Sequence, residues 1–183
     1  LKSDFGKYIV IFLFMTLTIG FVSGFLVADD SMLAAYDEGF EKYNIEHGNF
    51  TLSSKASESD LKKIEKNGKV RICENFYRDE ATDADLDGKE EGTMRIYQER
   101  TDMNLVCLMS GGMPAAKNEI AIDRMYADNN KLKVGDKLKI AGEELTVTGL
   151  VALPDYSCLF SDNSDMMFDA VKFGVAIIPE GGL

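Results

Sequence analysis

Histidine, tryptophan, proline and cysteine are scarce in this sequence of 183 residues, which has one, none, three and three of them respectively. The single histidine, His47, lies in a turn-like stretch, so we expect it on the surface rather than in a catalytic triad or a metal site. The three cysteines, Cys73, Cys107 and Cys158, are far apart, which excludes a C-x-x-C redox or zinc motif. Buried free thiols are favoured, and one disulfide with one thiol left over is the alternative.

Basic charge is also in short supply, with 20 Lys and Arg residues against 31 Asp and Glu, a net charge of −11 and a pI of about 4.6. This balance argues against a nucleic-acid partner, which requires a basic patch. The sequence contains no G-x-S-x-G, H-E-x-x-H or P-loop motif, so we expect no hydrolysis of ATP by this chain. With 45% hydrophobic and 28% charged residues, the composition is that of a folded domain.

One long run without charge, residues 8–28, dominates the N-terminal part. As a helix it would span roughly 31 Å, close to the hydrocarbon thickness of a bilayer. Lys2 and Lys7 precede it and two aspartates follow, which predicts a cytoplasmic N-terminus and an extracytoplasmic remainder at a cell membrane. A cleaved signal peptide is the alternative, but the run is long and Leu26 is too large for the position it would take before the cleavage point.

Within this predicted membrane helix, Gly20 and Gly24 form a G-x-x-x-G pattern. Such small residues let another helix approach closely, although glycine is also common in membrane helices generally.

We divide the chain into a cytoplasmic end (1–7), a transmembrane helix (8–28), a stalk helix (29–43) and an extracytoplasmic domain (44–183). The stalk is predicted because apolar residues recur at helical spacing and no proline or glycine interrupts residues 28–38. The initial Leu and the abrupt end predict that the protein is longer.

The extracytoplasmic domain is predicted to be α+β, because short strands and helices are interspersed without a βαβ rhythm. A hairpin with alternating polar and apolar residues is its clearest element. We expect strands at 50–52, 70–77, 93–99, 105–109, 119–122, 137–140, 145–151 and 173–178, and helices at 57–68 and 124–130. In the first of these helices we expect Ser57 as the cap and Leu61 and Ile64 facing inward.

Asp83, Asp85 and Asp87, followed by Gly88, match the first half of a calcium-binding loop. Alternating carboxylates can converge on one hard cation where glycine permits a sharp turn. The second half does not match, because the twelfth position is Met94 instead of a bidentate glutamate. We therefore favour a solvated acidic loop and keep the three aspartates only as a weak candidate metal site.

Residues 111–123 follow the pattern G-x-x-P-x-x-x-N-E-I-x-[IVL]-[DS], with Pro114, Asn118 and Glu119 at its named positions. Further along come Gly135 and Asp136 before the hairpin, Asp155 and Tyr156 after it, and a strand at 173–176. This order resembles the extracytoplasmic, MacB-like periplasmic core domain of FtsX-like (MacB-type) ABC transporter permeases of the Gram-positive type. The resemblance is firmest over 111–157, while 53–110 carry little of it and Gly112 stands where Arg is frequent.

The resemblance implies an ABC transporter permease subunit whose outer domain couples ATP-driven motion to the export or extraction of a substrate. It implies a cytoplasmic ATPase subunit and a second permease copy as partners, and no catalytic residue or cofactor in this domain. The motif residues can equally be scaffold residues that make turns and bind local backbone. Two other hypotheses remain: a membrane-anchored extracellular binding or sensor module without transport activity, and a tethered hydrolase that uses the acidic cluster.

Overall fold

The computed structural model describes residues 5–162 and 164–182. The chain forms two compact units that divide after Lys42. Residues 1–4 of the predicted cytoplasmic end, with Lys2, lie outside the described residues. Each unit follows from a different sequence pattern.

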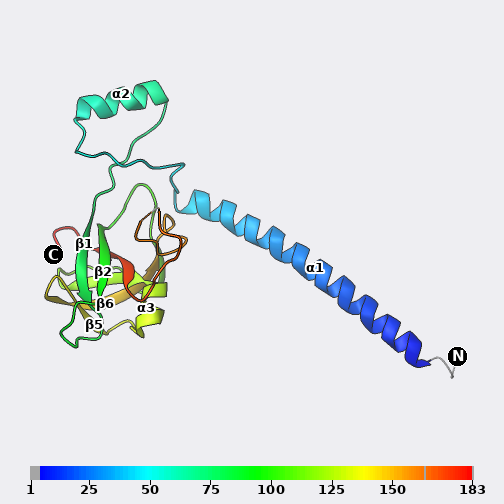
Figure 1. Cartoon of the computed structure of the whole chain (residues 1–183). Coiled ribbons are helices and arrows are strands. Elements are labelled where there is room, and N and C mark those ends of the chain that lie inside the picture. The colour runs from blue at the N-terminus through cyan, green and yellow to red at the C-terminus, as the bar shows by residue number, and fades with distance from the viewer. Residues whose placement is uncertain (1–4, 163, 183) are drawn as a thin grey trace. The chain divides into compact units, whose positions relative to one another are not determined.

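The first unit is one unbroken helix, α1 (Phe5–Lys42), drawn in blue in Figure 1. Within the described residues it is the one helix long and apolar enough to cross a membrane, a property that a signal sequence shares. Its threonines suit an apolar surrounding, because the hydroxyls of Thr16 and Thr18 donate to main-chain oxygens one turn earlier, both at 2.8 Å. A Cβ added at Gly20 or Gly24 would meet no atom within 4 Å.

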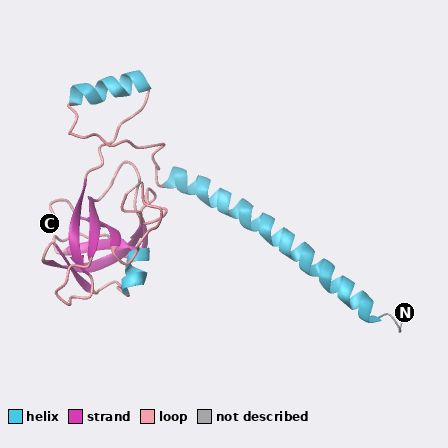
Figure 2. Ribbon diagram, viewed as in Figure 1, coloured by secondary structure: helices cyan, strands magenta, loops and turns pink. Residues whose placement is uncertain are grey.

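The described residues of the second unit form seven strands and two helices, so a mixed α+β fold is confirmed (Figure 2). The strands are β1 (Tyr77–Asp83), β2 (Gly92–Gln98), β3 (Cys107–Gly111), β4 (Glu119–Asp123), β5 (Lys137–Ile140), β6 (Glu143–Ala152) and β7 (Phe173–Ile178). The helices are α2 (Glu58–Gly68) and α3 (Arg124–Asn130).

The sheet closes on itself like a barrel, which the sequence did not predict. Its strand order is β3-β6-β4-β7-β2-β1-β5, and β5 pairs again with β6. The long strand β6 makes this possible: its first half pairs with β5, its last residues pair with β3, and its other edge pairs with β4. Closure satisfies main-chain groups that an open sheet would expose at its edges.

The core lies within and around this closed sheet. Alternate residues of β6 are buried, and all six residues of β7 are buried. The ring of Tyr126, from α3, reaches Gly174 on β7, where an added Cβ would lie 2.6 Å from two of its ring atoms. A residue without a side chain is therefore required at this point of β7.

Two of the strand predictions, at 50–52 and at 70–77, are wrong. Residues 50–52 are not a strand, and the strand expected at 70–77 begins only at Tyr77 and continues to Asp83. Three consecutive charged residues in β1 conceal it from a hydrophobicity pattern. They are tolerated because β1 pairs with β2, where Asp79 lies opposite Arg95 and forms an ion pair with it.

The helix α2 has the predicted cap but not the predicted packing. The Ser57 hydroxyl accepts the Asp60 N–H at 3.3 Å, and the helix ends at Gly68 as expected. However, no residue of α2, all of which the structure describes, is buried, and Ile64 remains 37% exposed. The inward orientation expected for Ile64 is therefore wrong, and Leu61 is only half-buried.

Asp123 ends β4 and caps α3, since its Oδ1 accepts the N–H groups of Met125 at 2.7 Å and Tyr126 at 3.1 Å. Its side chain is buried, and burial raises the pKa of its carboxyl. A raised pKa in the folded state means that stability falls as the pH rises through the interval between the unfolded and folded pKa values.

We expect Asp123→Asn to be at least as stable as the wild type near neutral pH, because Asn keeps the cap without a buried charge. The advantage should decrease as the pH falls through the raised pKa of Asp123, because protonation removes the buried charge. Asp123→Ala should be about 1 kcal/mol less stable than Asp123→Asn at either pH, because it lacks the cap. Urea unfolding at the two pH values measures all three proteins, and an advantage of Asn that grew in acid would contradict the burial argument.

Candidate functional site

The residues that follow α1 are held by a set of hydrogen bonds that we call the anchor clamp, made of Tyr43, Asn44, Glu46, Asn104 and Leu105. The main-chain N–H groups of Leu105 and Asn104 donate to the carbonyls of Tyr43 and Asn44, at 2.8 and 3.0 Å. The Asn104 side chain accepts the Glu46 N–H at 2.9 Å and donates to its carboxylate at 2.7 Å.

Asn104 is the centre of the anchor clamp. It is 3% exposed and has a φ of 51°, a left-handed conformation that Asn tolerates better than most residues. A buried amide requires its hydrogen bonds, and here both ends of the amide have partners in Glu46. The segment after the helix is thus fixed to the segment before β3 within the same unit.

Arg100 links the anchor clamp to the sheet. Its Nη1 donates to the main-chain oxygen of Asn104 at 3.5 Å and to the Asp155 carboxylate at 2.7 Å. The side chains of this ion pair are only 8% and 11% exposed, and the guanidinium lies 4.2 Å from the ring centre of Tyr97. Among the described residues, nothing accepts a hydrogen bond from its buried Nε and Nη2.

A second set of contacts continues across β2 and β1. The hydroxyls of Tyr97 and Tyr156 lie 2.7 Å apart, and Arg95 donates to Tyr156 at 3.3 Å. Arg95 also forms two hydrogen bonds, each of 2.8 Å, with the Asp79 carboxylate. We call the six residues Asp79, Arg95, Tyr97, Arg100, Asp155 and Tyr156 the polar network.

The electrostatics of the polar network favour a fixed structure over proton transfer. Burial raises the pKa of Tyr97 above its ordinary value, so this phenol stays protonated. Hydrogen bonding to Asp79 raises the pKa of the Arg95 guanidinium, which stays charged. These groups therefore keep their protonation states at any ordinary pH, and the network is suited to holding segments together.

A hollow of about 500 Å³ lies beside Arg95. Arg95 and Lys172 bring positive charge to it, and Asp79, Asp165 and Asp169 bring negative charge. Met167 and Phe173 add apolar surface. The carboxylates of the three aspartates already accept hydrogen bonds within the protein, from Arg95, Ser161 and the Val171 N–H. The lining therefore mixes both charges with apolar surface and does not favour one class of ligand.

The motif on which the family resemblance depends forms turns. Both main-chain N–H groups after the buried Pro114 donate to one oxygen of Glu119, at 2.8 and 3.0 Å, and these bonds lower the pKa of that carboxyl. The Asn118 carbonyl accepts the Thr146 N–H at 2.9 Å. Gly135, at φ 98°, and Asp136, whose carboxylate accepts the Lys133 N–H, make the turn into β5.

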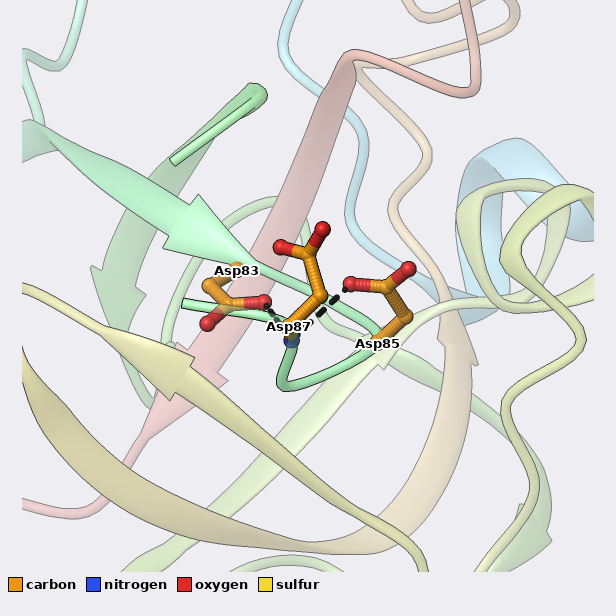
Figure 3. Close-up of side chains that lie close together, drawn as sticks. All are labelled: Asp83, Asp85 and Asp87. Atoms are coloured by element: carbon orange, nitrogen blue, oxygen red, sulfur yellow. Dashed lines mark hydrogen bonds between the residues drawn. The ribbon is translucent and has the colours of Figure 1, made fainter. Parts of the chain in front are cut away.

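The acidic cluster forms the loop between β1 and β2 (Figure 3). The carboxylates of Asp83, Asp85 and Asp87 lie within 4.8 Å of one another. Both oxygens of buried Asp83 already accept main-chain N–H groups, from Asp87 at 3.1 Å and Gly88 at 3.0 Å. Asp87 forms an ion pair with Lys89. The loop is thus stabilised by its own N–H groups, and Met94 lies in the core.

The three cysteines are free and half-buried rather than fully buried. Cys107 accepts a hydrogen bond of 3.0 Å from the Tyr43 hydroxyl and so extends the anchor clamp. Cys73 lies 3.4 Å from the Asp102 carboxylate, which also pairs with Arg71.

Asp155 and Tyr156 stand out in the sequence as part of the family motif, whereas their partners do not. Arg95 and Tyr97 lie two residues apart on β2, a spacing that places both on one face of a strand, and this was the available signal. Nothing in the sequence connects them with residues some sixty positions further on. Comparison of the chain with protein-family models, with curated proteins and with solved structures finds no match.

Proposed function

We propose that this chain is part of an ABC transporter permease subunit, anchored in the cell membrane by α1 with its N-terminus in the cytoplasm. The observation that supports this most is the continuity of α1, which passes from the apolar run to Lys42 without a break, directly before the anchor clamp. The resemblance of residues 111–157 to MacB-type permeases supports it independently. ATP hydrolysis then belongs to a cytoplasmic partner subunit.

The mechanical consequence follows from the contacts. A helix transmits displacement along its axis because its hydrogen bonds run in that direction. Movement of α1 would pull on Tyr43 and Asn44, which the anchor clamp joins to Asn104 and through it to Arg100. The buried pair with Asp155 then carries the displacement to the closed sheet. The outer unit would move as a rigid body and act on a substrate at the outer membrane face.

The proposal is tested by isolating the full-length protein from its native membranes in mild detergent. A cytoplasmic ATPase with a P-loop should copurify, and the complete gene should encode three further apolar spans after the outer unit. A gene that ends without them and a protein that purifies without an ATPase would exclude a permease.

We expect insertion of Gly-Gly after Ala34 to uncouple the two units, since two glycines add a flexible point to the helix. In the complex with its ATPase, trapping ATP should change hydrogen exchange at residues 104–107 in the wild type and leave it unchanged in this variant. The same insertion after Gly88, in the exposed β1–β2 loop, is the control and should preserve the response. A normal response with the stalk insertion would refute mechanical coupling.

A membrane-anchored binding module without transport activity is the second candidate. The hollow beside Arg95 favours it, because a binding module requires a concave surface. A complete gene with α1 as its one apolar span, together with saturable binding of a ligand that Arg95→Ala abolishes, would support this alternative.

A further inference from the structure

Basic charge is concentrated in one segment of this acidic chain. Residues 53–71, which we call the basic segment, contain six Lys and Arg residues and three acidic ones, a net charge of +3. Since the whole chain carries −11, the remainder carries −14. The basic segment includes α2 and the connections on either side of it.

The basic segment also exposes apolar side chains. Ile64 lies on the same face of α2 as half-buried Leu61, and Val70 follows the helix at 53% exposure. An amphipathic helix normally covers such a face, and no residue of α2 is buried. The basic segment thus combines positive charge with uncovered apolar surface.

A second exposed apolar patch has the opposite charge. The methionine loop, residues 161–162 and 164–172, exposes Met166 at 96% and Met167 at 85%, with Phe168 and Val171 about half exposed. Three aspartates and one lysine give it a net charge of −2. Its aspartates make its turns: Asp162 and Asp165 bind Ser164 and Ser161, and Asp169 accepts main-chain N–H groups.

From these two patches we infer that the basic segment of one copy of this chain docks on the methionine loop of a second copy. Leu61, Ile64 and Val70 would pack on Met166 and Met167, whose flexible side chains adapt to an apolar partner. The charges around the two patches are of opposite sign, so they favour this contact. A contact between two basic segments is disfavoured, because their charges repel. Both patches are small, but two copies held in one membrane meet at high effective concentration.

This contact is tested with the full chain in vesicles of phosphatidylcholine and phosphatidylglycerol. A benzophenone amino acid replaces Ile64, and equal amounts of ¹⁴N- and ¹⁵N-labelled chains are mixed before illumination. We expect crosslinks from position 64 to residues 166–168 that join light and heavy chains. Crosslinks within one isotope only would place the contact inside a single chain, crosslinks to lipid would assign the basic segment to the membrane surface, and no crosslink would mean no contact; each result overturns the inference.

Two variants of Met166 test the role of charge without affecting the fold, because this side chain makes almost no contact with the protein. Met166→Lys should lower the yield of mixed-isotope crosslinks about tenfold, since it adds like charge at the contact. Met166→Glu removes the same methionine but adds charge opposite to that of the basic segment, so its yield should stay well above that of Met166→Lys. Equal yields from the two variants would overturn a charge-matched contact. The inference rests on the membrane anchor of the proposed function, but its test does not depend on whether an ATPase copurifies, so the failure of one can be told from the failure of the other.

Discussion

Replacing Asp155 with Ala is expected to lower the free energy of unfolding by about 3–5 kcal/mol, because it leaves the buried Arg100 guanidinium without its counter-ion. Two nitrogens of Arg100 already have no acceptor among the described residues, so the guanidinium has little else to stabilise it. The loss of the 2.7 Å ion pair would also detach Arg100 from its position between Asn104 and Tyr97.

Urea unfolding of the full chain in micelles, followed by tyrosine circular dichroism, measures this loss. The matched control is Asp102→Ala, which breaks the Arg71–Asp102 pair of nearly the same length, 2.8 Å, but with both side chains about 60% exposed. That change should cost far less, because water screens an exposed ion pair. The double variant Arg100→Leu with Asp155→Leu should recover most of the stability, because paired removal leaves no buried charge. Equal losses at Asp155 and Asp102 would show that an arginine left without its counter-ion costs no more when it is buried than when it is exposed.

Gly174→Val is the substitution with the second largest expected effect. Its Cβ would lie 2.6 Å from the Tyr126 ring and 3.1 Å from the Met94 sulfur, and both of those side chains are fully buried. Neither can move into free space, because interiors are close-packed. We expect a loss of about 3 kcal/mol from overpacking.

Gly112→Val is the control for this variant, because an added Cβ at Gly112 meets no atom within 4 Å. It should change stability by less than about 0.5 kcal/mol. Thermal unfolding of both variants in the same detergent gives the comparison. Wild-type stability of Gly174→Val would mean that α3 can withdraw from β7 without cost, contrary to the packing seen here.

Caps, continuous apolar runs and alternation predicted those helices and strands that neighbouring residues determine. The helix at 124–130 and the strand at 173–178 have the expected bounds, because a cap and a continuous apolar run define them. The hairpin of β5 and β6 follows from alternation around a short turn. Strand β1 was missed because its charges are stabilised by β2, a partner that hydrophobicity does not reveal.

The candidate site could be predicted only in part for the same reason. Asp155 and Tyr156 were noticed through a family resemblance, whereas Arg95, Tyr97 and Arg100 become their partners only after the sheet closes. Asn104 has no motif around it, and its role depends on bonds to Glu46 across 58 positions. Ring closure itself requires β5 to pair with both β1 and β6, a condition set by the whole fold.

The position of β6 also bears on how the outer unit comes apart. This one strand borders β3, β4 and β5. Losing it would open the ring, leave β3 without a partner strand, and remove one of the two partners of β4 and of β5. Partial melting of the sheet therefore has no stable intermediate. Slow amide exchange in β4, β6 and β7 should therefore occur through a single global opening event with one shared free energy.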